Sequence, residues 1–136
     1  MSIIINIFNE SSRKRIPRKK IILSLKKLFS MEGYDTATIN IIFIDDIAIK
    51  ELNKQYLKHN YTTDVISFCL EKEPLEGEVY ISVETAEVNS KEYKTSWTAE
   101  IIRYAIHGVL HIIGYDDYSL EEREKMRKLE DKYITI

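Results

Sequence analysis

Two histidines four residues apart, followed at fixed distances by a glycine and an aspartate, are the residues of this sequence best suited to chemistry. They lie in the segment HGVLHIIGYDD, residues 107–117. On a helix, His107 and His111 project from one face, close enough for both imidazoles to contact one cation. Gly114 can end the helix and turn the chain back, so that Asp117 faces the same cation. This spacing predicts a three-ligand Zn²⁺ site with its fourth position open to water, which is a catalytic arrangement.

The third ligand and the reaction leave alternatives open. A pair of histidines four residues apart also occurs on helices that bind no metal, and it is the glycine and the aspartate that favour a metal site. Asp116 is the rival of Asp117 as third ligand, or it orients a ligand through a hydrogen bond. Peptidases with an HExxH motif carry a glutamate directly after the first histidine, where this chain has Gly108. Proteolysis is therefore a minor hypothesis, and hydrolysis by water activated on the metal is the expected reaction.

The hydrophobic pattern predicts the elements that must position these residues. Apolar side chains fill most of the circumference of segment 99–114, which predicts a core helix at the end of a mostly helical stretch, 84–114. Strands are predicted at 2–9, 36–45, 64–70 and 77–83, and further helices at 17–33, 46–57 and 119–135. Ser119 and Glu122 predict a capping box on the last helix. The order β-α-β-α-β-β-α-α predicts a layered α/β domain of the α+β class, with a small mixed four-stranded sheet and four to five helices.

Composition bounds the class of protein. A chain of 136 residues with 44% hydrophobic residues can bury one core, so we expect a single domain spanning 1–136. The sole cysteine, Cys69, cannot form an internal disulfide, and no segment has the length of a membrane span or the form of a signal peptide. We therefore expect a cytoplasmic protein without membrane contact. The formal net charge of -2 identifies no partner on its own.

Three segments resemble the YbeY family of endoribonucleases, the rRNA maturation factors. HGVLHIIGYDD is similar to the family signature H-G-x-L-H-x-x-G-Y-D-H. LNKQYLKHNYTTDVISF, residues 52–68, resembles the segment L-N-x-x-[YF]…T-D-V-L-S-F, and GEVYIS, residues 77–82, resembles the strand G-D-I-x-I-S. The resemblance implies one zinc ion per chain and cleavage of single-stranded RNA. It also implies action in rRNA 3′-end processing and ribosome quality control, with the small ribosomal subunit and ribosomal proteins as partners.

This sequence departs from the family pattern at two positions. Asp117 stands where most members have a third histidine, so other divalent ions become competitors of zinc. The family arginine linked to catalysis is expected at Leu57. Arg103, one helical turn before the first histidine, is our candidate for stabilising phosphoryl charge in its place, and Lys58 is a weaker one. The alternative for Arg103 is a salt bridge to Glu100 or a neighbouring acid.

Several further residues are candidates for RNA contact. Thr63 and Asp64 either end a loop by hydrogen-bonding its backbone or line the cleft beside the metal. Tyr115 packs at a corner or stacks on a base. A basic run between residues 13 and 20, which begins with Arg13, Lys14 and Arg15, is either a solvated face or a track for the RNA backbone.

Two other functions remain open at this stage. One is a non-catalytic assembly factor that binds RNA or a ribosomal protein and uses its metal structurally, which would require a fourth protein ligand. The other is a generic zinc hydrolase acting on a small molecule, which would lack the salt-dependent binding that an RNA substrate produces.

Overall fold

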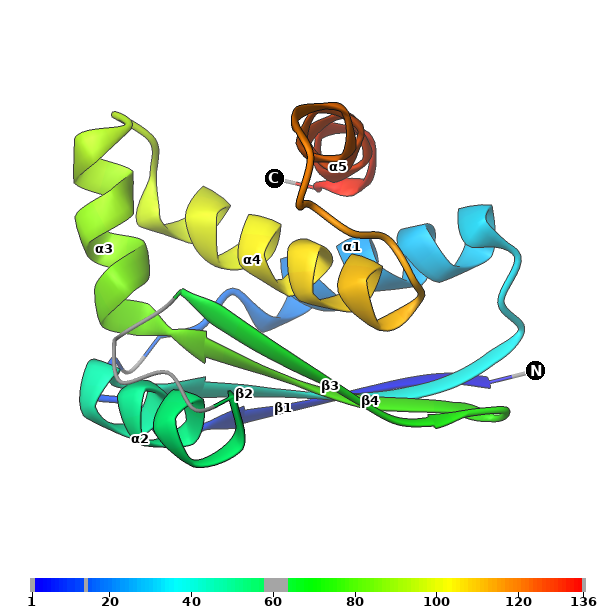
Figure 1. Cartoon of the computed structure of the whole chain (residues 1–136), viewed down its shortest axis with the longest axis horizontal. Helices are drawn as coiled ribbons and strands as arrows, with labels where there is room; N and C mark the ends of the chain where they lie inside the picture. The colour runs from blue at the N-terminus through cyan, green and yellow to red at the C-terminus, as the bar shows by residue number, and fades with distance from the viewer. Residues whose placement is uncertain (1, 14, 58–63, 136) are drawn as a thin grey trace.

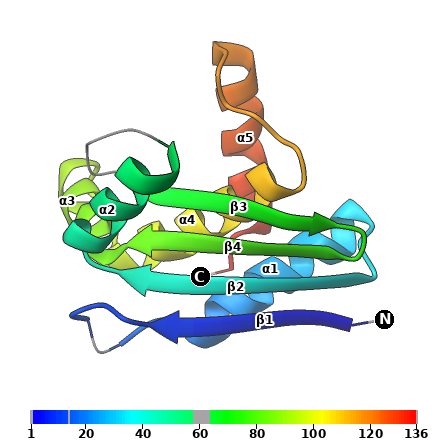
Figure 2. The same cartoon turned by 60° about the horizontal axis from the view of Figure 1, so that its bottom comes forward.

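The computed structural model describes residues 2–13, 15–57 and 64–135, which form one mixed sheet and five helices. The strands are β1 (Ser2–Asn9), β2 (Thr36–Ile44), β3 (Val65–Lys72) and β4 (Leu75–Ser82). Figure 2 shows their order across the sheet, β1-β2-β4-β3. β1 and β4 run parallel to β2, and β3 runs antiparallel to β4. The predicted small mixed sheet is confirmed.

The helices lie on both faces of this sheet. They are α1 (Arg18–Glu32), α2 (Asp46–Leu57), α3 (Val83–Glu92), α4 (Trp97–Ile112) and α5 (Leu120–Tyr133). α1 and α4 cover one face with α5 outside them, and α2 lies against the opposite face (Figure 1). The predicted α+β class is confirmed. No helix in the described part of the chain has both the length and the apolar character that a membrane crossing requires.

The stretch 84–114, predicted as mostly helical, divides into two helices. α3 ends at Glu92, and Lys94 has a φ of 56°, a left-handed conformation that a right-handed helix cannot include. The side chain of Ser96 then accepts a hydrogen bond from the backbone N–H of Ala99 and caps α4. Because of this break, α4 takes a direction different from that of α3 (Figure 1).

A glycine lets α4 approach the sheet closely. At Gly108, a Cβ atom would lie 2.5 Å from Cγ1 of Val79 on β4, too close for the packing to remain unchanged. The hydroxyl of Ser67 on β3 donates a hydrogen bond of 2.9 Å to the Gly108 carbonyl and ties the helix to the sheet. The position that carries a glutamate in HExxH peptidases is therefore a packing contact in this chain.

Side chains from α1 and α5 hold the turn that follows α4. Tyr115, in the turn, donates a hydrogen bond of 2.8 Å to Oε1 of Glu32 in α1. Tyr133 of α5 donates to the other oxygen of the same carboxylate. Ser119 and Glu122 form the predicted capping box at the start of α5. These contacts fix the segment that connects α4 to α5.

Substitution of Gly108 by alanine should destabilise the fold, because the new methyl group would overlap Val79. Overpacking of a core costs about 1–3 kcal/mol, whereas alanine contributes a gain of about 1 kcal/mol in a helix. We expect Gly108→Ala to lower the free energy of unfolding in urea by up to about 2 kcal/mol. In the double variant Gly108→Ala/Val79→Ala the overlap is gone, so the two single losses should not add. Additive losses would show that the methyl group meets no obstacle on β4.

Candidate metal centre

Donor atoms of His107, His111 and Asp117 converge at the C-terminal end of α4. The Nε2 atoms of the two imidazoles are 3.0 Å apart, and Oδ2 of Asp117 lies 3.3 Å from the first and 3.4 Å from the second. The three side chains are 22%, 28% and 33% exposed, in chain order, so solvent reaches the group. The fold therefore brings together the three residues that the sequence spacing selects as ligands.

The separations of these three atoms fit a tetrahedral metal ion. With metal–ligand distances of about 2.0–2.2 Å, the edges of a tetrahedron measure about 3.3–3.6 Å. The three observed separations, 3.0, 3.3 and 3.4 Å, are close to these edges. Two imidazole nitrogens and one carboxylate oxygen are ligands that Zn²⁺ accepts, and the oxygen also suits harder divalent ions. These residues could therefore hold a metal ion with little rearrangement.

The local fold returns Asp117 to the two histidines. α4 ends at Ile112, and Gly114 has a φ of 111°, which glycine adopts without strain. Beyond this turn, the Nε–H of Arg123 in α5 donates a hydrogen bond of 3.0 Å to the backbone carbonyl of Asp117. Gly114 thus has the turning role predicted for it, and α5 holds the backbone of the third donor.

The three donor residues His107, His111 and Asp117 are called the metal group below, and Glu130 of α5 contacts this group through His107. Its Oε2 lies 2.7 Å from Nδ1 of His107, and its Oε1 accepts a hydrogen bond of 3.0 Å from Nη1 of Arg103. Burial favours the neutral form of His107, but the hydrogen bond with Glu130 and the nearby negative charges outweigh burial and raise the pKa of this imidazole. Glu130 therefore connects one donor residue to a neighbouring arginine.

Arg103 pairs with two acids of α5, which is the kind of contact given as the alternative to its catalytic role. Besides the bond to Glu130, its Nη2 donates a hydrogen bond of 2.9 Å to Oδ1 of Asp131. Burial lowers the pKa of the guanidinium, but the hydrogen bonds with Asp131 and Glu130 outweigh burial and raise it. Glu100, which the sequence offered as a salt-bridge partner of Arg103, instead accepts a hydrogen bond from the Thr95 hydroxyl.

Comparison with known proteins assigns the family. The model of the endoribonuclease YbeY family matches residues 6–136. The chain belongs to the YbeY family. It is 35% identical over 127 residues to the endoribonuclease YbeY of Chlorobium chlorochromatii, a match that covers 93% of this chain and 81% of that protein. It is also 35% identical over 135 residues to the endoribonuclease YbeY of Chloroherpeton thalassium, covering 98% and 94%.

A solved structure has a similar fold. The solution structure of a Thermotoga maritima protein matches with a TM-score of 0.67 and 30% sequence identity, over 96% of this chain and 86% of that one. The family match and the named relatives confirm the resemblance to the YbeY family predicted from three short segments.

The other candidate site residues include two next to the metal group in the sequence and two outside the described residues. Asp116 is exposed and is not part of the three-donor group found among the described residues. Tyr115 is held by its bond to α1, and Nζ of Lys125 lies 5.4 Å from the centre of its ring. Packing is thus the role that its contacts favour. Lys58 and Thr63 lie outside the described residues.

Arg13 and Arg15 of the basic run lie at the opposite end of α4 from the metal group. Arg13 forms an ion pair of 3.0 Å with Glu87, and its guanidinium carbon lies 4.1 Å from the centre of the Trp97 ring. Arg15 lines the same hollow as Trp97, and Lys14 is outside the described residues. Trp97 is ten residues before the first histidine, about 15 Å along a helix axis. The run and the metal group are therefore separate features of one helix.

A groove of about 530 Å³ is lined by Glu130, which contacts His107, but by none of the three donor residues. Asp64, just before β3, lines it, and its Oδ1 also accepts a hydrogen bond of 2.8 Å from the backbone N–H of Val65. Both predicted roles of Asp64 are compatible with this position. The charged residues that line the groove are Asp64, Glu100, Arg103, Arg127, Glu130 and Asp131. Acids outnumber arginines there, so the groove is the acidic side of the site.

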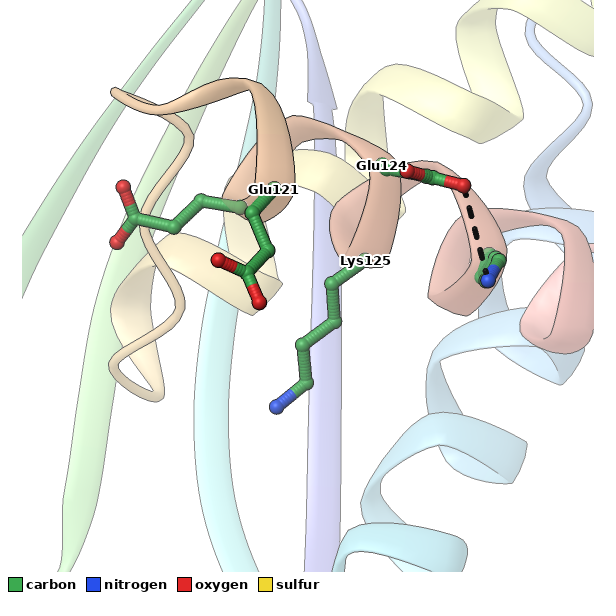
Figure 3. A pocket seen from close by; sticks show the side chains of 5 residues that line it. Glu121, Glu124 and Lys125 are labelled. Carbon is green, nitrogen blue, oxygen red and sulfur yellow. Dashed lines mark ion pairs between the residues drawn. The ribbon is translucent and has the colours of Figure 1, made fainter.

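A second hollow lies on α5, and none of the three donor residues lines it. Figure 3 shows Glu121, Glu124 and Lys125 around it, all from this one helix. Lys128 pairs with Glu124 at 3.8 Å, one turn away, and both side chains are largely exposed. This arrangement is typical of a solvated helix face with paired charges.

Two acids that support the site were not predicted from the sequence. Glu130 contacts a metal-group histidine, and Glu32 holds the turn that leads to Asp117. The spacing of Arg103 and His107, four residues apart, does predict that the two side chains share a face. That spacing does not show which residue of another element contacts both side chains.

Replacement of any of the three donor residues by alanine should abolish tight metal binding. Loss of a residue that only supports a ligand weakens metal affinity by about 10- to 100-fold, and loss of a ligand should weaken it more. The measurement is a Zn²⁺ titration in competition with a chromophoric chelator for His107→Ala, His111→Ala and Asp117→Ala. Asp116→Ala, which removes the same charge one residue earlier, should bind as the wild type does. Metal loss in Asp116→Ala but not in Asp117→Ala would overturn the assignment of the third ligand.

Proposed function

We propose that this protein is a zinc-dependent endoribonuclease that cleaves single-stranded RNA, with one Zn²⁺ per chain. The observation that carries the proposal is the convergence of His107, His111 and Asp117 in a chain that belongs to an endoribonuclease family. We infer further that it acts in the cytoplasm on rRNA of the small ribosomal subunit. Maturation of rRNA 3′ ends and ribosome quality control are its proposed roles, with ribosomal proteins as further partners.

The donor set favours a catalytic rather than a structural metal. Among the described residues, three donors and no fourth histidine, cysteine, aspartate or glutamate belong to the group. A zinc ion held there would supply Lewis acidity for polarising a phosphoryl oxygen and activating water. The two imidazoles and the carboxylate bind and orient the ion, and their partial exposure leaves a side that RNA can approach. Gly108 offers no side chain as a base, which favours phosphodiester over peptide hydrolysis.

Arg103 is the proposed stabiliser of phosphoryl charge. It is one turn before His107 on α4, and it lines a groove together with Glu130, which contacts His107. Its two ion pairs leave other N–H donors of the guanidinium free to bind a phosphate. Lys58 is the weaker candidate, and Asp64 is proposed to line the RNA cleft with Thr63. Arg13, Lys14 and Arg15 are proposed to extend the RNA track toward the other end of α4.

A non-catalytic assembly factor is the second candidate function. α2 ends at Leu57, the position at which the family arginine is expected, and Arg103 is already paired with two acids. Both observations favour a chain that binds RNA without cleaving it. A generic zinc hydrolase is a weaker alternative, because the relatives are named endoribonucleases. Salt-dependent RNA binding would separate the first two functions from the third.

The zinc-loaded protein should cleave single-stranded RNA and leave duplex RNA of the same sequence intact. Removal of metal by a chelator should abolish cleavage, and added Zn²⁺ should restore it. The double variant His107→Ala/His111→Ala, purified in parallel, should neither retain zinc nor cleave. One zinc per chain without cleavage would favour the assembly factor, and cleavage by the double variant would show that a metal-independent activity is responsible.

Arg103→Ala should slow cleavage by about 100-fold if the guanidinium stabilises phosphoryl charge. The rate is measured in single-turnover cleavage, with the zinc content of each sample determined first. Lys128→Ala, which removes a positive charge from the outer face of α5, is the matched control and should cleave at the wild-type rate. Full activity in zinc-loaded Arg103→Ala would rule out this role.

A further inference from the structure

The carboxylate of Glu130 contacts two different side chains in a nearly buried position. Its side chain is 10% exposed, whereas that of the adjacent Asp131 is 60% exposed. Oε2 lies 2.7 Å from Nδ1 of His107, and Oε1 accepts a hydrogen bond of 3.0 Å from Arg103. A buried carboxylate is unfavourable unless its oxygens are bonded, and here both are.

The atom that Glu130 contacts decides which nitrogen of His107 is free. A carboxylate oxygen accepts a hydrogen bond, so Nδ1 of the imidazole must carry the proton. In the neutral ring, Nε2 then has an exposed lone pair. Nε2 is the atom that lies 3.0 Å from Nε2 of His111 and 3.3 Å from Oδ2 of Asp117, so it is one of the three donor atoms of the proposed metal site.

We propose that Glu130 is a positioning residue of the metal centre, which holds the His107 ring in the tautomer and orientation that direct Nε2 at the ion. Arg103 holds the carboxylate from its other oxygen, so the chain Arg103–Glu130–His107 leads into the site. This inference rests on the proposed metal-dependent function. Acids that bond to the second nitrogen of a metal-binding imidazole fix its ring and increase its basicity as a ligand.

The alternative is an ion pair that only attaches α5 to α4. Arg103 supplies that attachment by itself, because it also bonds to the exposed Asp131 on the same helix. An attachment does not need a second, short contact to the imidazole. Glu130 and Asp131 are adjacent acids that share one arginine, and only Glu130 contacts a metal-group residue. Asp131 is therefore the matched control.

Zinc affinity separates the two roles. We expect Glu130→Ala to bind Zn²⁺ about 10- to 100-fold more weakly than the wild type in a chelator competition. Glu130→Gln keeps an oxygen acceptor and nearly the same shape, so its loss should be smaller. Asp131→Ala should retain wild-type affinity. Thermal unfolding of each metal-free variant shows whether it is folded. If Glu130→Ala does not fold, the zinc affinity of Glu130→Gln is compared with that of Asp131→Ala instead.

The metal-free protein gives a second measurement that does not depend on activity. The nitrogen chemical shifts of His107, recorded at a pH where the ring is neutral, report which nitrogen carries the proton. We expect the Nδ1–H tautomer in the wild type and in Asp131→Ala, and a shift toward the Nε2–H tautomer in Glu130→Ala.

The outcomes separate this inference from the proposed function. Wild-type zinc affinity and an unchanged tautomer in Glu130→Ala would overturn the positioning role while leaving the metal centre intact. An equal loss of zinc affinity in Asp131→Ala would show that these acids only attach α5 to α4. A wild-type protein that binds no zinc at all would overturn the metal centre itself, and with it both proposals.

Discussion

The close packing of α4 on the sheet is the constraint on which the site depends. Contact between Gly108 and Val79, with the hydrogen bond from Ser67, fixes both the distance and the rotation of the helix. Most of the helix surface is then buried in the core. Only a narrow strip remains for polar side chains, and His107 and His111 lie on it. Because the helix cannot rotate, the two imidazoles meet at one defined point.

α5 holds two of the three donor residues in place. Arg123, in its first turn, holds the backbone of Asp117, and Glu130, in its last, contacts His107. The Tyr133 hydroxyl shares the Glu32 carboxylate with the turn between the two helices. Between α4 and α5 themselves, Glu130 contacts both His107 and Arg103, and Asp131 contacts Arg103. Hydrogen bonds have preferred distances and directions, so these polar contacts add to the packing in defining one geometry for the donors.

The sequence predicted the elements and the three donors because their signals are local. A strand of alternating burial, a capping box and an HxxxH pair each depend on residues within about one to four positions of one another. Asp117 follows His111 by six positions, across a single turn at Gly114. The break at Lys94 was missed because a lysine with a positive φ carries no mark in the sequence. The contact between Glu130 and His107, 23 residues apart along the chain, depends on how α5 crosses α4. That crossing is set by tertiary packing, which no short pattern records.

The most direct test of the account is a crystal structure of the zinc-loaded protein with anomalous diffraction at the zinc edge. We expect one ion within about 2.0–2.2 Å of Nε2 of His107, Nε2 of His111 and a carboxylate oxygen of Asp117. The fourth position should face solvent, and Nδ1 of His107 should still contact Glu130. A zinc ion elsewhere, or one closed off by a fourth protein ligand, would contradict the account.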